Sequence, residues 1–236
     1  MESDKNFVEA VGVYANYLKR KLKNALAQSA QLAQELDGSF PRRLFEQKDG
    51  ISEAEFNVRF ERLKLTQQAL ANFGLSSSHQ DNQPSYKAEN AKALKVYVED
   101  TEKKLGVFSD MLAKLEVFSS MIARREFSCK RLVISKDDGF KFETDNGQPL
   151  PLSKLSSGEQ QELVLLYELL FKTEPGALLL IDEPEISLHV AWQKAFLADL
   201  EEIIRLAKIN VVVATHSPQI INNRWDLTVD LWDLSK

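Results

Sequence analysis

The residues with the clearest chemical potential are two adjacent carboxylates, Asp182 and Glu183, which follow the apolar run 178–181. Such a run predicts a buried strand, and ligands of open α/β sheets bind at the carboxyl ends of their strands. An aspartate there can hold Mg²⁺, directly or through water, while the next carboxylate takes a proton from water that attacks a γ-phosphate. Asp and Pro are also common in turns, so Asp182-Glu183-Pro184 equally fits a strand that simply ends.

A serine-rich segment lies upstream of this strand and reads Leu155-Ser156-Ser157-Gly158-Glu159-Gln160. Ser157 with Gln160 fits a capping box, which would make the segment only the start of a helix. Alternatively, the hydroxyls, the free N–H groups and the positive end of the helix dipole are presented to a phosphate. Gly158 would then let the backbone approach closely, and the sequence leaves both interpretations open.

A histidine, His216, follows a second apolar run at 211–214, within Thr215-His216-Ser217-Pro218. From a neighbouring strand its imidazole could reach the same ligand, donating a hydrogen bond to a γ-phosphate oxygen or to the attacking water. A lone histidine at a strand end is also commonly structural, so this alternative stays open.

Long helices dominate the chain before these segments. Apolar or small residues recur in 4-3 alternation over 6–36 and again over 94–122, the period of helices that pack along a seam, and the two runs suit an antiparallel hairpin. Between them we expect a turn over 37–41, a helix over 52–73 that opens with a Ser52/Glu55 capping box, and a polar loop over 76–84.

The pattern changes after about Arg124. We expect a hairpin of strands near 131–134 and 140–143, then a helix over 158–172, a strand over 177–181, a helix over 188–206 and a strand over 210–214. Apolar strands that alternate with helices indicate a parallel sheet covered on both faces. The sequence thus divides into a helical arm, 1–125, and an α/β lobe, 126–236.

Composition limits the classes of protein. The 236 residues carry a net charge of -5, which argues against a generally cationic nucleic-acid binder, although Lys19-Arg20-Lys21 with Lys23, Arg124-Arg125 and Lys130-Arg131 are local basic runs. No apolar run is long enough for a membrane span and the N-terminus has no signal-peptide core, so we expect a cytoplasmic protein without a membrane partner. The single cysteine, Cys129, is interpreted as a structural thiol.

The three polar segments, in this order, resemble the ABC-type ATPase superfamily. Leu155-Ser-Ser-Gly-Glu-Gln looks like its signature motif, Leu178-Leu-Leu-Ile-Asp-Glu-Pro like Walker B and Ala214-Thr-His-Ser like the switch loop. The likeness is greater to the branch with helical arms, the SMC, RecF and overcoming-lysogenization-defect relatives. Within that branch, segments 36–44 and 182–193 look like bacterial ATP-binding proteins, several of which act in anti-phage defence.

The resemblance implies a partial P-loop NTPase fold, a parallel sheet flanked by helices with an N-terminal antiparallel arm, and ATP and Mg²⁺ as cofactors. By family position Asp182 serves the Mg²⁺ and water shell, Glu183 is the general base and His216 is the γ-phosphate switch. The implied nucleotide clamp, which acts across a dimer interface, comprises Ser156, Ser157, Gly158, Glu159 and Gln160. Ser187-Leu188-His189 falls at the family's D-loop, with a histidine in place of the usual acidic residue.

One element of the family is absent from these 236 residues: Gly-x-x-x-x-Gly-Lys-Ser/Thr does not occur, and none of the nine glycines is followed by lysine. Without that backbone nest and its lysine, we expect the chain alone to bind nucleotide weakly. We therefore expect an ATPase half-module that is active only with a Walker A lobe, from a missing N-terminal segment or a partner, and in a head-to-tail homodimer. The alternative is a non-catalytic interaction or nucleic-acid-associated fragment with relic motifs; an effector nuclease or DNA would be further partners.

Overall fold

The computed structural model describes residues 2–76, 84–125, 127, 130–186, 188 and 190–229. The chain forms two compact units. The C-terminal unit comprises Met1–Tyr14, Lys114–Leu132 and Phe142–Lys236, and the arm unit comprises Ala15–Ala113 and Val133–Lys141. No helix in the described part of the chain combines the length and apolarity that crossing a bilayer requires. The expected division at residue 125 stays a prediction.

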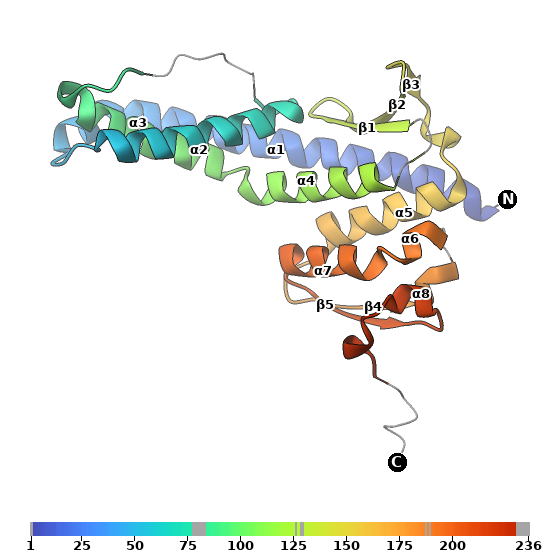
Figure 1. The fold of residues 1–236 in the computed structure, drawn as a ribbon. Coiled ribbons are helices and arrows are strands. Elements are labelled where there is room, and N and C mark those ends of the chain that lie inside the picture. The colour runs from blue at the N-terminus through green and yellow to red at the C-terminus, as the bar shows by residue number, and fades with distance from the viewer. Residues whose placement is uncertain are drawn as a thin grey trace. The chain divides into compact units, whose positions relative to one another are not determined.

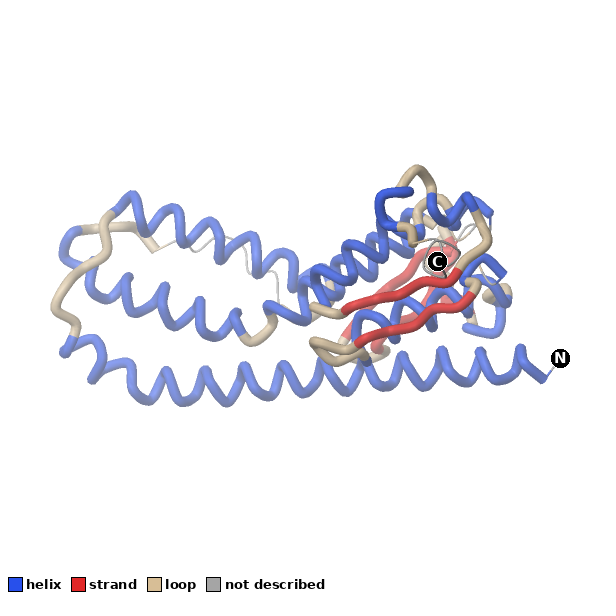
Figure 2. Tube along the Cα trace, turned by 90° about the horizontal axis from the view of Figure 1, so that it is seen from below, coloured by secondary structure: helices blue, strands red, loops and turns tan. Residues whose placement is uncertain are grey.

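Helix α1 (Glu2–Glu46) is the longest element and is drawn as one continuous helix from the N-terminus (Figure 2). It confirms the helix expected over 6–36, but the turn expected over 37–41 is wrong, because α1 continues through that stretch with Pro41 inside it. A proline there removes a backbone donor and crowds the preceding turn. The carbonyl left without its amide donor is that of Asp37. The neighbouring Leu36 carbonyl accepts hydrogen bonds from the Ser39 hydroxyl at 3.2 Å and from Arg43 Nη2 at 2.7 Å, so side chains add contacts close to the proline.

The remaining helices of the arm unit are α2 (Glu53–Asn72), the short η1 (Ala88–Asn90) and α3 (Ala91–Gly106), with the first residues of α4 (Ser109–Arg124). The Glu55 amide donates to the Ser52 hydroxyl at 3.2 Å, which confirms Ser52 as the N-cap of α2. Residues 77–83 of the expected polar loop lie outside the described part.

The second long helix of the sequence analysis is instead two helices. The structure breaks it after Gly106, and α4 starts at Ser109, whose hydroxyl donates to the Gly106 carbonyl at 2.9 Å. Glycine is a poor helix former and Phe108 is buried, so a bend that buries the phenyl ring is favoured over a straight helix. The apolar alternation continues across the break, so the sequence pattern did not predict two separate helices.

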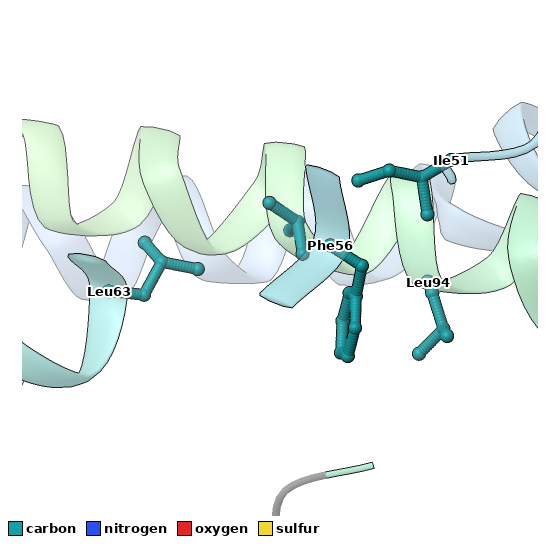
Figure 3. Packing of buried hydrophobic residues seen from close by; sticks show 5 residues of the cluster. Ile51, Phe56, Leu63 and Leu94 are labelled. Carbon is teal, nitrogen blue, oxygen red and sulfur yellow. The ribbon is translucent and has the colours of Figure 1, made fainter. Parts of the chain in front are cut away.

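Helices α1 and α3 run antiparallel within the arm unit. Arg43 pairs with Asp100, with Nη2 and Oδ2 2.7 Å apart, and Asp37 pairs with Lys104 at 2.9 Å. The later residue of α1 thus contacts the earlier residue of α3, as in an antiparallel pair. Helix α2 packs against α3 through an apolar cluster that Figure 3 shows from close by. The cluster comprises Ile51, Phe56, Leu63, Leu94 and Val98. The expected antiparallel arm is thus present, with α2 as a third helix.

The expected hairpin is present as β1 (Lys130–Ser135) and β2 (Gly139–Thr144), followed by β3 (Pro149–Leu150), which pairs antiparallel with β2. Its turn ends at Gly139, whose φ of 74° lies in the left-handed region. A β-carbon at Gly139 would lie 1.8 Å from the carbonyl oxygen of Ala15 on α1. The hairpin can therefore approach the α1 backbone only because this residue has no side chain.

The C-terminal unit holds the α/β elements. In chain order they are η2 (Leu152–Lys154), α5 (Ser157–Tyr167), the π-helical turn η3 (Glu168–Lys172), β4 (Leu178–Asp182), η4 (Pro184–Ile186), α6 (Val190–Gln193), α7 (Phe196–Ala207), β5 (Asn210–Ala214), α8 (Pro218–Ile221) and η5 (Trp225–Leu227). The strand expected over 210–214 is confirmed, but the helix expected over 188–206 divides into α6 and α7. The Asn222 side chain donates to the Lys194 carbonyl at 2.7 Å between them, which satisfies an acceptor that the break releases.

Strands β4 and β5 lie side by side as a parallel pair (Figure 1), with Leu180 opposite Val212 and Asp182 opposite Ala214. Exposure alternates along both strands. Leu178, Leu180 and Val212 share the exposed face, where they are 63%, 72% and 56% exposed. The parallel pairing is confirmed, whereas coverage of both faces is not found within the described residues. We call the three residues the open face.

Replacing Gly139 with alanine is expected to destabilise the protein by roughly 2–4 kcal/mol, because the left-handed conformation costs about 1 kcal/mol and the clash with the α1 backbone adds the rest. Gly147→Ala is the matched control, since Gly147 has the same φ of 74° but open space where a β-carbon would lie. Urea unfolding of both variants measures the difference. Equal losses would contradict the close approach.

Candidate functional site

The exits of β4 and β5 bring two of the predicted site residues together. Because Asp182 pairs with Ala214 in parallel register, both strands end at the same edge. The Glu183 amide donates to the Ala214 carbonyl at 2.8 Å and continues the ladder by one bond. From this edge, His216 Nε2 lies 3.6 Å from Glu183 Oε1. A carboxylate and an imidazole at this separation can act on one small reacting group between or beside them.

The three strand-tip side chains are accessible to a ligand. Asp182 lies on the exposed side of β4, next to the open face. The Glu183 side chain is 41% exposed and that of His216 is 91% exposed. Glu183 has a φ of 44°, a left-handed conformation that an L-residue with a long side chain rarely adopts. Strained backbone of this kind clusters at functional sites, although the chemical roles of these residues stay predictions.

A third carboxylate, Glu185 on η4, joins the two strand exits and was missed by the sequence analysis. Its Oε1 accepts from the Thr215 hydroxyl at 2.7 Å and from the His216 amide at 2.9 Å. Burial opposes its ionisation, but hydrogen bonds from its own backbone amide, from the Thr215 hydroxyl and from the backbone of His216 and Ser217 outweigh burial and lower the pKa of Glu185. The signal in the sequence was the second glutamate of Asp-Glu-Pro-Glu, which no simple turn requires.

The serine-rich segment opens α5, but its cap lies one residue earlier than predicted. Ser156 is the N-cap: its hydroxyl accepts from the Glu159 amide at 3.3 Å, and Glu159 Oε2 accepts from the Ser156 amide at 2.6 Å. The predicted Ser157/Gln160 capping box is therefore wrong. Extended backbone at Ser156 and helical backbone from Ser157 onward decide which hydroxyl can reach back to the helix.

The side chains of Glu159 and Gln160 point into the protein. Glu159 pairs with Lys130 of β1, with Nζ 2.6 Å from Oε2, and Gln160 donates to the Leu155 carbonyl at 2.8 Å. Both residues are buried, whereas Ser156 and Ser157 are exposed. Within the described ranges, no hydrogen bond or ion pair joins this segment to Asp182, Glu183 or His216. The segment is thus a separately supported helix start.

Two predictions lie outside the described residues. Ser187 and His189 of the D-loop segment are not among them, and neither is Cys129. Among the residues that are described, no group of three or more His, Cys, Asp or Glu side chains is arranged to hold a metal ion. Mg²⁺ characteristically takes one or two carboxylates together with substrate phosphates and water, and Asp182 is an exposed carboxylate at the end of β4.

The basic runs near the C-terminal unit are neutralised by acidic partners. Arg125 is buried between Glu162 and Asp199, with its Nη2 2.5 Å from Glu162 Oε1 and 2.8 Å from Asp199 Oδ2. Burial raises the pKa of Glu162 and the nearby guanidinium opposes the rise. The other pairs are Arg124 with Asp199 and Glu202, Lys130 with Glu159, and Arg131 with Glu143. These contacts favour a structural role over a phosphate-binding surface.

A comparison with known protein families identifies the family of this chain. The family described as "AAA domain, putative AbiEii toxin, Type IV TA system" matches residues 14–222. Because the match spans most of the chain, the chain belongs to this family of AAA domains, and it is an ATPase-type nucleotide-binding module. No curated protein matches the chain.

Replacing Ser156 with alanine is expected to cost about 1 kcal/mol, the usual effect of losing an N-cap hydroxyl. The matched control is Ser157→Ala: Ser157 is exposed on the first turn of α5, so its loss should change stability by less than about 0.5 kcal/mol. Thermal or urea unfolding measures both. A larger loss for Ser157→Ala would contradict the assignment of Ser156 as the cap.

Proposed function

We propose that this chain is the signature and Walker B half of an ABC-type ATPase, related to the SMC, RecF and overcoming-lysogenization-defect branch. The observation that carries the proposal is the contact of 3.6 Å between His216 and Glu183 at the exits of two parallel strands. In this proposal the module hydrolyses ATP only when a Walker A lobe completes it and two copies associate head to tail.

Each strand-tip residue has one task in this mechanism. Asp182 holds Mg²⁺, a role that suits an exposed carboxylate at a strand end. Glu183 accepts a proton from the attacking water, and His216 donates a hydrogen bond to a γ-phosphate oxygen. Bound Mg²⁺ would neutralise charge that develops on the phosphates. The side chains of Glu183 and His216 need no rearrangement to act together, because they are already in contact.

The start of α5 forms the nucleotide clamp of the proposed dimer. Ser156 and Ser157 are exposed, and Gly158 has open space where a β-carbon would lie, so a phosphate can approach the first turn closely. Glu159 and Gln160 contribute from inside, since their side chains support the segment through Lys130 and the Leu155 carbonyl. A clamp without contacts to the strand tips of its own chain suits a site shared between two copies.

The open face is the surface on which we propose that the Walker A lobe packs. Leu178, Leu180 and Val212 present adjacent apolar side chains on one side of a two-stranded sheet, directly beside Asp182. Contiguous exposed apolar side chains mark interaction surfaces in soluble proteins. A lobe seated there would bring its phosphate-binding loop to the edge where the carboxylates lie. The family description names a type IV toxin–antitoxin system, in keeping with an anti-phage or toxin role in the cytoplasm for the complete protein.

Adding a lobe that carries Gly-x-x-x-x-Gly-Lys-Ser/Thr is expected to give ATP turnover, which Glu183→Gln lowers by roughly 10² to 10⁴ because a general base is lost. Phosphate release measures this effect. Glu201→Gln is the control, since Glu201 pairs with Arg224 on the surface and should leave turnover unchanged. Undiminished turnover in Glu183→Gln would remove Glu183 as the base. A bound lobe without any turnover would instead favour the non-catalytic interaction protein.

A charge on the open face is expected to block assembly without unfolding the chain. Leu180→Glu should alter stability by less than about 0.5 kcal/mol, because Leu180 is 72% exposed, yet weaken binding of the Walker A lobe about tenfold or more, because a buried unpaired carboxylate is costly. Val58→Glu on α2 is the control with similar exposure. Calorimetry compares the two variants, and equal affinities would exclude this face as the docking surface.

A further inference from the structure

One carboxylate connects the loops that follow β4 and β5. Glu185 lies on η4, directly after the β4 exit, and its Oε1 accepts from both the Thr215 hydroxyl and the His216 amide. The Thr215 hydroxyl in turn accepts from the Ser217 amide at 3.0 Å. Three consecutive residues after β5 therefore depend on a single oxygen supplied from the neighbouring strand exit.

A buried glutamine reinforces this connection. Gln193 at the end of α6 donates through Nε2 to the carbonyls of Glu185 and Leu188, both at 3.2 Å. Its Oε1 accepts from the Ser217 hydroxyl at 3.3 Å. The loop that carries Glu185 and the loop that carries His216 are thus joined twice, once through a charged acceptor and once through a neutral amide.

The imidazole of His216 has little support of its own. Its side chain is 91% exposed, and the contact that the structure describes for it is the one with Glu183. Its place is therefore set through the backbone, whose amide is held by Glu185. Hydrogen bonds to an ionised acceptor are stronger than those between neutral groups, so the bonds that Glu185 accepts from Thr215 and His216 hold this exposed loop more firmly than a neutral acceptor would.

We propose that Glu185 is a positioning residue that holds the His216 loop so that the imidazole stays beside Glu183. The proposal rests on the proposed function for the catalytic roles of Glu183 and His216, but the contacts on which it is based lie within this chain. Loss of Glu185 would leave Asp182, Glu183 and His216 chemically intact but remove the charged acceptor of the His216 amide, so that the neutral link between Gln193 and Ser217 would remain to join the two loops. The role is distinct from the tasks of those three residues, because Glu185 itself faces Thr215 and the backbone.

The test measures the placement of His216 in the isolated chain by NMR, without nucleotide. In the wild-type background, Glu183→Gln should shift the ring signals of His216, because the two side chains are in contact. In a Glu185→Ala background the same substitution should leave them unmoved. The His216 amide should also exchange with solvent about tenfold faster or more in Glu185→Ala, since a hydrogen bond to a charged acceptor is lost. His216→Gln assigns the ring signals among three histidines.

Conservative variants keep the test decisive if Glu185→Ala unfolds. Glu185→Gln retains an acceptor oxygen and should restore most of the coupling, and Thr215→Val should remove only the protection of the Ser217 amide. Glu201→Gln is the control and should alter none of these signals. Unchanged His216 ring response and amide exchange in Glu185→Ala would overturn the proposal. If alanine unfolds the chain, Glu185→Gln carries the test: its neutral acceptor should keep most of the ring response but let the His216 amide exchange severalfold faster, and unchanged amide exchange there would overturn the proposal.

Turnover of the module completed by a Walker A lobe separates this proposal from the proposed function. If Glu185 positions His216, Glu185→Ala should lower kcat while KM for ATP changes little, because the residue does not face the nucleotide. Coupling in the NMR experiment together with no turnover in the wild-type mixture would refute the ATPase proposal and leave the positioning role intact. A fall in kcat without any change in coupling would refute the positioning role alone.

Discussion

Parallel pairing of β4 with β5 is the constraint on which the candidate site depends. Because the register sets Asp182 opposite Ala214, both strands end at the same edge of the sheet. A hydrogen bond from the Glu183 amide to the Ala214 carbonyl joins their ends. Every contact of the site follows from this geometry, including that of Glu183 with His216 and that of Glu185 with the second loop. A shift of either strand by one residue would send alternate side chains to the opposite face and separate these groups.

The candidate site residues of the C-terminal unit lie in two separate segments, each held by its own contacts. The start of α5 is held by its own capping box and by the ion pair between Lys130 and Glu159. The strand exits are held by Glu185 and Gln193. Neither set of contacts depends on the other. The two segments are therefore supported separately within the described residues.

The sequence predicted the positions of α1, α2, β4 and β5 well, although the burial expected for both faces of β4 and β5 is not found among the described residues. Its predictions failed where contacts outside the local segment decided the conformation. Pro41 suggested a turn, but α1 continues through it, and Ser39 and Arg43 donate to the nearby Leu36 carbonyl. Gly106 hides a break because the apolar phase continues across it. The sequence predicted that the tips of two neighbouring strands share one ligand site, whereas the contacts of Glu185 could not be derived, since they depend on which loops the fold brings together.

Glu183 has a left-handed backbone conformation, with a φ of 44°, that a residue with a long side chain rarely adopts. That conformation costs a non-glycine residue about 1 kcal/mol or more, and glycine or asparagine would adopt it with less strain. The chain thus gives up conformational stability at the one position where a carboxylate faces the imidazole. If Glu183 is the general base, as we propose, the amino acid that best fits this backbone conformation differs from the one that accepts the proton, so stability and activity would be opposed at residue 183.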